Sequence, residues 1–325
     1  MRLSIRLSAL AATLALMGAG PAPLPLDHLL GDAVAARAFD YGALRESLGP
    51  DGLKALDQQV RGTLQARRAA DPGQCEPLAE AFVRQGVASA AIADDAATWR
   101  ADWRTALDML DRLNAETAAK LASDGASAPP EDSVGAHLRA AKATTDPRLR
   151  ELFTRAAADQ ASRKVWAPVR GLPDGPRKMV SAPLGGQGCR IDADNTAWLK
   201  AQVRQFGWFT VARDGEQASE AAWLLVQHAD RDPTFQEEVL AILAKLQDSG
   251  ANTRINYAYL ADRVAVNAKR PQTYGTQGHC VGPGAWEPSE VRDPDGLDAR
   301  LAEVGLPPEA EYKAHFKDVC ANYKP

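Results

Sequence analysis

Polar side chains that can transfer a proton or hydrogen-bond a ligand are concentrated between residues 223 and 277. Among them, His228 shares a helical face with Ala221, Leu224 and Leu225, within a run that is apolar almost all round. This spacing predicts that the imidazole points inward, where it must find hydrogen-bond partners. His228 is therefore a candidate general acid or base, or a ligand-binding group. A core histidine satisfied by a carboxylate or a carbonyl is the structural alternative.

Two further residues are candidates for a catalytic role beside His228. Asp230 follows it by two positions, and Tyr274 lies in a loop around Gly275. Asp232 is instead predicted to cap a helix, because Pro233 fits the first helical position after it. No second histidine lies at ligand spacing, so neither a metal nor another cofactor is predicted.

The side chains predicted to bind a ligand are amides, a hydroxyl and a charged pair. A purely structural ion pair and a purely structural turn are the alternatives for the pair and for the loop after Pro271. The residues are Gln227, Gln236, Asp262, Arg263, Gln272, Thr276 and Gln277.

The elements that must position these residues are predicted to be helices. The composition, 45% hydrophobic and 25% charged, is that of a soluble globular chain, and apolar residues recur at helical spacing. Trp99 and Trp103 begin the clearest stripe, which continues through Leu107 to Leu113 and is predicted to be core. The fold class is therefore predicted to be all-α, with a loop-rich C-terminal tail.

Changes in composition suggest how the chain is divided. Residues 1–20 carry two arginines, an apolar run and then small residues, which is the order of a secretory signal. Glycine and proline accumulate between residues 171 and 188, so residues 167–190 are predicted to be a linker. It would join an N-terminal helical domain, residues 27–166, to a C-terminal helical domain, residues 191–325.

The predicted signal implies a periplasmic or secreted protein. Once the signal is removed, no membrane-inserted segment is expected. Losing Arg2 and Arg6 would take the formal charge from -4 to -6, and no long basic run remains to bind nucleic acid. The even number of cysteines predicts two structural disulfides in an oxidising compartment. Their connectivity and the oligomeric state are left open. The cysteines are Cys75, Cys189, Cys280 and Cys320.

Three motifs, in order, give the C-terminal half a familiar pattern: Gln227-His228-Ala229-Asp230, Asp262-Arg263 and Tyr274-Gly275-Thr276-Gln277. From about Asp192 to Tyr312 the chain resembles a bacterial family of domains of unknown function. The resemblance implies one compact helical domain and supplies no activity, substrate or cofactor. Trp208-Phe209 and Leu301 depart from the family pattern.

These residues leave three functions open. The first is an envelope protein that binds a small polar or peptide-like ligand at the predicted surface. The second is a hydrolase in which His228, oriented by Asp230 or Asp262, activates water while Tyr274 or Gln277 stabilises negative charge. The third is a structural envelope protein. Convergence of these side chains around a cavity would disfavour the structural alternative.

Overall fold

The computed structural model describes residues 26–71, 73–321 and 323, and the predicted signal, residues 1–20, lies outside them. Within this range the chain is predominantly helical, which confirms the all-α prediction. None of the described helices is long and apolar enough to cross a membrane. In chain order the helices of the first half are α1 (Ala33–Ala38), α2 (Tyr41–Ala70), α3 (Leu78–Ile92), α4 (Ala96–Leu121), α5 (Ser133–Ala143), α6 (Pro147–Lys164) and α7 (Trp166–Arg170).

The second half continues the helical pattern and contains a small hairpin that was not predicted. Its helices are α8 (Asp174–Phe206), α9 (Val211–Asp214), α10 (Glu216–Gln227), α11 (Pro233–Lys245), α12 (Ala251–Asn267), α13 (Leu297–Val304) and α14 (Glu309–Ala314). The hairpin pairs β1 (Gly278–Gly282) with β2 (Ala285–Pro288) in antiparallel register, with Cys280 opposite Trp286. Short 3-10 turns occupy Asp27–Leu29, Gln247–Ser249 and Pro294–Gly296.

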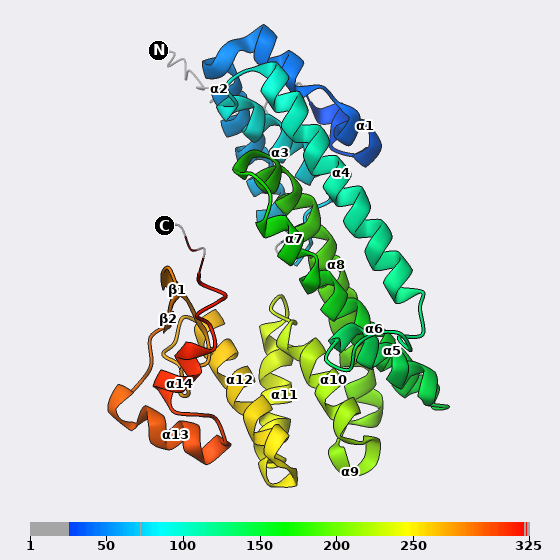
Figure 1. The fold of residues 1–325 in the computed structure, drawn as a ribbon, viewed down its shortest axis with the longest axis vertical. Helices are drawn as coiled ribbons and strands as arrows, with labels where there is room; N and C mark the ends of the chain where they lie inside the picture. The colour runs from blue at the N-terminus through cyan, green and yellow to red at the C-terminus, as the bar shows by residue number, and fades with distance from the viewer. Residues whose placement is uncertain (1–25, 72, 322, 324–325) are drawn as a thin grey trace, which may run out of the picture.

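Two hydrophobic cores lie along an elongated molecule. The first joins α1 to α4 with the beginning of α8, and the predicted Trp99–Trp103 stripe is at its centre, with the two rings stacked 5.2 Å apart. The second joins the end of α5, α6, α10, α11 and α12 to the later part of α8. Figure 1 shows α8 running between the two groups of helices. One helix therefore holds both cores in a fixed relation.

The glycine-rich segment predicted to be a linker is largely helical, because it falls in α7 and the first half of α8. Its small residues permit close packing. A Cβ on Gly175 would lie 2.0 Å from Asp102 Oδ2, and one on Gly186 would lie 3.2 Å from the Glu76 carbonyl oxygen. The division into domains at residues 27–166 and 191–325 stays a prediction.

Two disulfides tie distant parts of the chain together, as the even cysteine count predicts. Cys75, in the segment between α2 and α3, is bonded to Cys189 on α8, and Cys280 on β1 is bonded to Cys320 near the C-terminus. The second bond lies in a small aromatic core in which Trp286 stacks on Phe316 at 4.5 Å. The first bond fastens the α2–α3 segment against the middle of α8.

Candidate functional site

The residues predicted to form one site are divided among separate hydrogen-bond networks. Within the described chain, no hydrogen bond joins His228 to Asp230, Asp262, Tyr274 or Gln277. Each of these side chains, except His228, has partners that hold local structure. Of the five, His228 lines the cavity described below.

Asp262 organises the loop that follows α12. Its side chain is fully buried and accepts the backbone N–H groups of Thr273 (2.7 Å), Tyr274 (3.0 Å) and Thr276 (2.8 Å), together with the Thr276 hydroxyl (2.9 Å). A carboxylate offers about four acceptor positions, so these donors leave it little capacity for a ligand. Asp262 and Thr276 therefore shape the loop instead of facing a cavity.

Gln272 fastens the same loop to the segment after β2. Its amide nitrogen donates to the carbonyl oxygens of Gln277 (2.7 Å) and Ser289 (2.8 Å), and its amide oxygen accepts from the Gln277 backbone N–H (2.9 Å). The Gln277 side chain donates to the Thr276 hydroxyl at 3.2 Å. These amides satisfy backbone groups that would otherwise be buried without partners.

Tyr274 is half-buried and packs edge-on against Tyr257, with ring centroids 6.5 Å apart. Burial raises the pKa of its phenol, and the neighbouring Tyr257 and Asp262 act in the same direction. Such a phenol is a poor general base near neutral pH, although it can still donate a hydrogen bond.

Asp230 pairs with α12 and not with His228. Arg263 donates to both of its carboxylate oxygens, at 2.8 and 2.6 Å, and Asn267 and Gln236 add donors at 2.9 and 3.2 Å. Burial acts to raise the pKa of Asp230, but the hydrogen bonds and charge of Arg263 outweigh it and hold the pKa below its ordinary value. Gln236, fully buried, also donates to the Val226 and Gln227 carbonyls. Asp262 and Arg263 thus have separate structural roles: Asp262 holds the loop after α12, and Arg263 pairs with Asp230.

His228 is held by residues that the sequence did not single out. At the end of α10, its Nδ1 lies 2.8 Å from Oδ1 of Asp159, a residue of α6 with no exposed surface. Its Nε2 accepts from Nε of Arg163 at 3.1 Å, and the Gln227 amide lies 3.4 Å away. Since arginine can only donate, these partners assign the neutral tautomer with hydrogen on Nδ1. Protonation at Nε2 would place an N–H against the Arg163 N–H.

Arg163 links His228 to two carboxylates. Its guanidinium lies 3.3 Å from Asp159 Oδ1 and donates to Asp192 Oδ1 on α8 at 2.9 Å. Burial raises the pKa of Asp192, and Arg163 opposes that rise. We call Asp159, Arg163, Asp192 and His228 the His228 cluster. Only the i,i+4 spacing of Asp159 and Arg163 was a local signal for it, because His228 lies more than 60 positions away in the sequence.

A cation could be held by three members of this cluster. Ligand atoms of Asp159, Asp192 and His228 lie within 4.8 Å of one another. The Arg163 guanidinium already contacts all three side chains and supplies the positive charge that the buried Asp159 and the half-buried Asp192 carboxylates need. A metal ion would have to displace it.

A cavity of about 280 Å³ opens beside the His228 cluster. Asp192, Thr196 and Lys200 on α8 form one side, and His228, Arg231 and Asp232 form the other. Asp232 also caps α11 by accepting the Phe235 N–H at 3.1 Å, which confirms its predicted role, and it pairs with Lys200. The wall therefore presents both charges and a histidine to one small volume.

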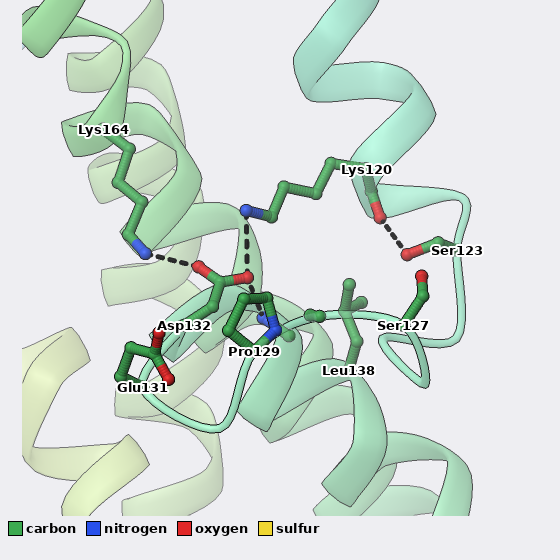
Figure 2. Close-up of a pocket in the computed structure, with 10 residues that line it drawn as sticks. Lys120, Ser123, Ser127, Pro129, Glu131, Asp132, Leu138 and Lys164 are labelled. Atoms are coloured by element: carbon green, nitrogen blue, oxygen red, sulfur yellow. Dashed lines mark hydrogen bonds and ion pairs between the residues drawn. The ribbon is translucent and has the colours of Figure 1, made fainter.

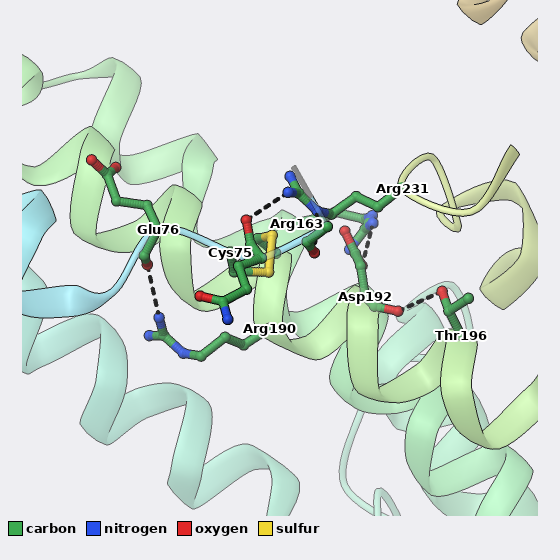
Figure 3. The surroundings of a disulfide bond; sticks show 10 residues. Cys75, Glu76, Arg163, Arg190, Asp192, Thr196 and Arg231 are labelled. Carbon is green, nitrogen blue, oxygen red and sulfur yellow. Dashed lines mark hydrogen bonds and ion pairs between the residues drawn. A yellow bond between two sulfur atoms is a disulfide. The ribbon is translucent and has the colours of Figure 1, made fainter. Parts of the chain in front are cut away.

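The segment between α2 and α3 completes the wall of this cavity. Gly73 lines the cavity, and Arg231 donates to the Gly73 and Gln74 carbonyls at 3.2 and 2.5 Å. Figure 3 shows Arg231 reaching this segment beside the Cys75–Cys189 disulfide, with Asp192 and Thr196 nearby on α8. The disulfide and Arg231 thus fix one side of the cavity.

A larger cavity, of about 600 Å³, lies at the start of α5. Figure 2 shows Lys120 and Lys164 approaching Asp132 from two sides, at 2.9 and 2.5 Å. Asp132 also caps α5 by accepting the Gly135 N–H at 3.0 Å. The two ammonium groups and the Gly135 N–H already satisfy this carboxylate, so these contacts stabilise the start of α5.

Comparison with known proteins identifies a family. A model described as a family of unknown function, DUF6624, matches residues 147–322, which is more than half of the chain, and the chain belongs to this family. No curated protein and no solved structure matches it. The match begins at α6, well before Asp192, and so includes every member of the His228 cluster. That the three sequence motifs are features of this family, and that the family is bacterial, stay predictions.

Proposed function

We propose that this member of the DUF6624 family binds a small zwitterionic molecule, of amino-acid or dipeptide size, in the cavity beside His228. The proposal rests on one observation: the His228 cluster borders a cavity of about 280 Å³. Ligand sites are typically concave and combine a few fixed polar groups with small or apolar walls. Ala193, Ala197 and Ala229 supply such walls here.

The charges around the cavity suggest how a zwitterion would be oriented. Lys200, which also pairs with Asp232, can share its charge with a ligand carboxylate, and Asp192, which also pairs with Arg163, can share its charge with an ammonium group. Thr196 adds a methyl surface, because its hydroxyl is directed to the Asp192 carbonyl at 2.7 Å. The proposal replaces most of the residues expected from sequence: His228 is kept, while Asp230, Asp262, Gln272 and Thr276 support the fold around it.

Export to the periplasm or the medium belongs to the same proposal. Two disulfides within the described chain are compatible with an oxidising compartment. The order of charge, apolar run and small residues at positions 1–20 supports a secretory signal. A protein in that compartment would meet free amino acids and short peptides.

The test is equilibrium dialysis against a library of amino acids and dipeptides. Ala197→Leu fills the cavity from α8 without removing a hydrogen bond. Ala201→Leu adds the same side chain to an exposed position of the same helix outside the cavity. We expect the wild type and Ala201→Leu to retain a ligand, and Ala197→Leu to lose at least tenfold in affinity at an unchanged melting temperature.

Equal retention by both variants would rule out this cavity as the site. Absence of any retained compound would favour the structural alternative, in which the His228 cluster only joins α6, α8 and α10.

A hydrolase is the second candidate, because one observation favours it. The buried Asp159 carboxylate lies 2.8 Å from His228 Nδ1, which is the arrangement that orients a histidine base. For water activation, Nε2 would have to be released by Arg163, which donates to it. Hydrolysis of dipeptides by the wild type, lost in His228→Gln while ligand retention persists, would support catalysis over binding alone.

A further inference from the structure

We propose a second ligand site that takes oxyanions: an arginine-lined cavity between α2, α3 and α8, beside the Cys75–Cys189 disulfide. The cavity has a volume of about 580 Å³ and shares Arg231 with the His228 cavity, while its other lining residues differ. Six of its eleven lining residues lie outside the residues that match the family, so it would be a property of this chain's first half joined to α8.

Arginine dominates the charged groups of this cavity. Arg68 on α2, Arg84 on α3 and Arg231 after α10 line it, and Glu76 is the one acid among the lining residues. A fourth guanidinium is close by, because a Cβ on Gly186 would lie 3.6 Å from Arg190 Nη1. The whole chain has a formal charge of -4, so this local excess of positive charge runs against the overall balance.

The arginines of this cavity already bind one carboxylate of the chain, that of Glu76. Arg84 holds the Glu76 carboxylate in a bidentate pair, with Nε–Oε1 at 2.7 Å and Nη2–Oε2 at 2.8 Å, and Arg68 adds a contact to Oε1 at 2.5 Å. A planar guanidinium matches carboxylate and phosphate oxygens in this bidentate manner. Asp57, whose charge also acts on Arg84, pairs with Arg61, so three guanidinium groups face two carboxylates and leave a net positive charge on this side of the cavity.

Small residues on α8 leave room for the ligand in front of these cations. Ala182, Gly185 and Gly186 form the floor, and a Cβ on Gly185 would meet no heavy atom within 4 Å. The Gln65 and Gln74 side chains also line the cavity and can add amide donors.

The disulfide holds the wall that carries Glu76. Arg231 donates to the carbonyls of Gly73 and Gln74, before Cys75, while Arg190 donates to the Glu76 carbonyl, after it, at 3.4 Å. Figure 3 shows Arg190 and Arg231 reaching this segment on either side of the bond. The cations are thereby positioned before a ligand arrives, which lowers the cost of ordering them on binding.

The test is titration calorimetry of the full chain with inorganic phosphate and with citrate, at low ionic strength, with sodium chloride as the ionic-strength control. We expect at least one oxyanion to bind, phosphate if the site takes phosphoryl groups and citrate if it takes carboxylates. Arg68→Gln should weaken that binding about tenfold, and Gly185→Leu should abolish it.

Two matched controls use the same helices. Arg61→Gln removes an α2 arginine that pairs with Asp57 outside the cavity, and Gly188→Leu fills open space on α8 away from the lining. Both should bind the oxyanion as the wild type does, and so should Ala197→Leu, which blocks the His228 cavity. Failure of both anions to bind, or binding that survives Gly185→Leu, would overturn the proposal. Loss in Ala197→Leu would instead assign the anion to the His228 cavity.

Discussion

At the scale of single residues, Asp159 is the fully buried carboxylate of the His228 cluster. It has no exposed surface; Arg163 supplies the positive charge beside it, and His228 and the Gln160 amide donate hydrogen bonds to its oxygens. Removing one partner of a buried charged network typically costs about 3–5 kcal/mol. The His228 cluster is therefore expected to contribute to folding as well as to the cavity.

Asp159→Asn should lower the free energy of unfolding by about 3 kcal/mol, because Arg163 loses a buried carboxylate. Asp194→Asn is the matched control, since Asp194 also pairs with an α6 arginine, Arg155, but its side chain is 74% exposed. Exposed pairs contribute about 0–1 kcal/mol. Urea unfolding of both variants measures the difference, and equal losses would show that burial does not matter at this position.

Asp262→Ala should destabilise the chain by about 3 kcal/mol, because three backbone N–H groups and the Thr276 hydroxyl lose their common acceptor. Asp298→Ala removes an exposed carboxylate with a single backbone donor, Glu309 N–H at 2.8 Å, and should cost about 1 kcal/mol or less. Urea unfolding again provides the comparison. An Asp262→Ala variant as stable as Asp298→Ala would contradict a structural role for Asp262.

At the scale of elements, helix starts were the most predictable feature. Asp232 caps a helix that opens with proline, as its sequence predicts, because capping depends on residues within one turn; Asp146 caps α6 in the same way. The glycine-rich part of α8 was interpreted as a linker, since local composition does not reveal that Gly175 and Gly186 meet other helices closely. The His228 cluster was missed for a similar reason: α6, α8 and α10 bring its members together only in the folded chain.

The start of α5 makes a prediction about pH. Burial acts to raise the pKa of Asp132, but hydrogen bonds from Lys164 and Lys120 and from the Gly135 N–H outweigh it and hold the pKa well below its ordinary value. A carboxyl whose pKa is lower in the folded than in the unfolded chain stabilises the fold above its unfolded pKa of about 3.9. That stability is lost as the pH falls through the folded pKa.

Unfolding free energy should therefore decrease below about pH 4 in the wild type, and Asp132→Asn should show a smaller decrease. Asparagine preserves the helix cap while removing the charge. Glu131→Gln, which removes the exposed acid one position earlier, should keep the wild-type slope. Parallel slopes for Asp132→Asn and the wild type would contradict the role of Asp132.

At the scale of the whole molecule, α8 and the disulfides join parts that the sequence separates. Cys75–Cys189 closes a sequence separation of 114 residues and Cys280–Cys320 one of 40. The sequence could predict that two bonds form, but not their pairing, because pairing depends on which segments meet in the fold. The all-α class was predictable from helical periodicity, whereas the small β1–β2 hairpin was not.

Replacing Cys75 and Cys189 with serine should reduce the free energy of unfolding by about 5 kcal/mol, as expected from the loop entropy that the bond removes from the unfolded chain. The same change at Cys280 and Cys320 should cost about 1 kcal/mol less, because its loop is shorter. Denaturant unfolding of the two double variants ranks the bonds. A larger loss at Cys280 and Cys320 would contradict this order.

The central claim, that a small zwitterion binds beside His228, is tested most directly by the imidazole nitrogen resonances of isotope-labelled protein. Before ligand is added, His228 should show the neutral tautomer with hydrogen on Nδ1, as its bonds to Asp159 and Arg163 require. Adding pooled amino acids and dipeptides should shift the His228 resonances while those of His279, exposed on β1, stay unchanged. Ala197→Leu should suppress the shift. His228 resonances that do not move with any pool would contradict the claim.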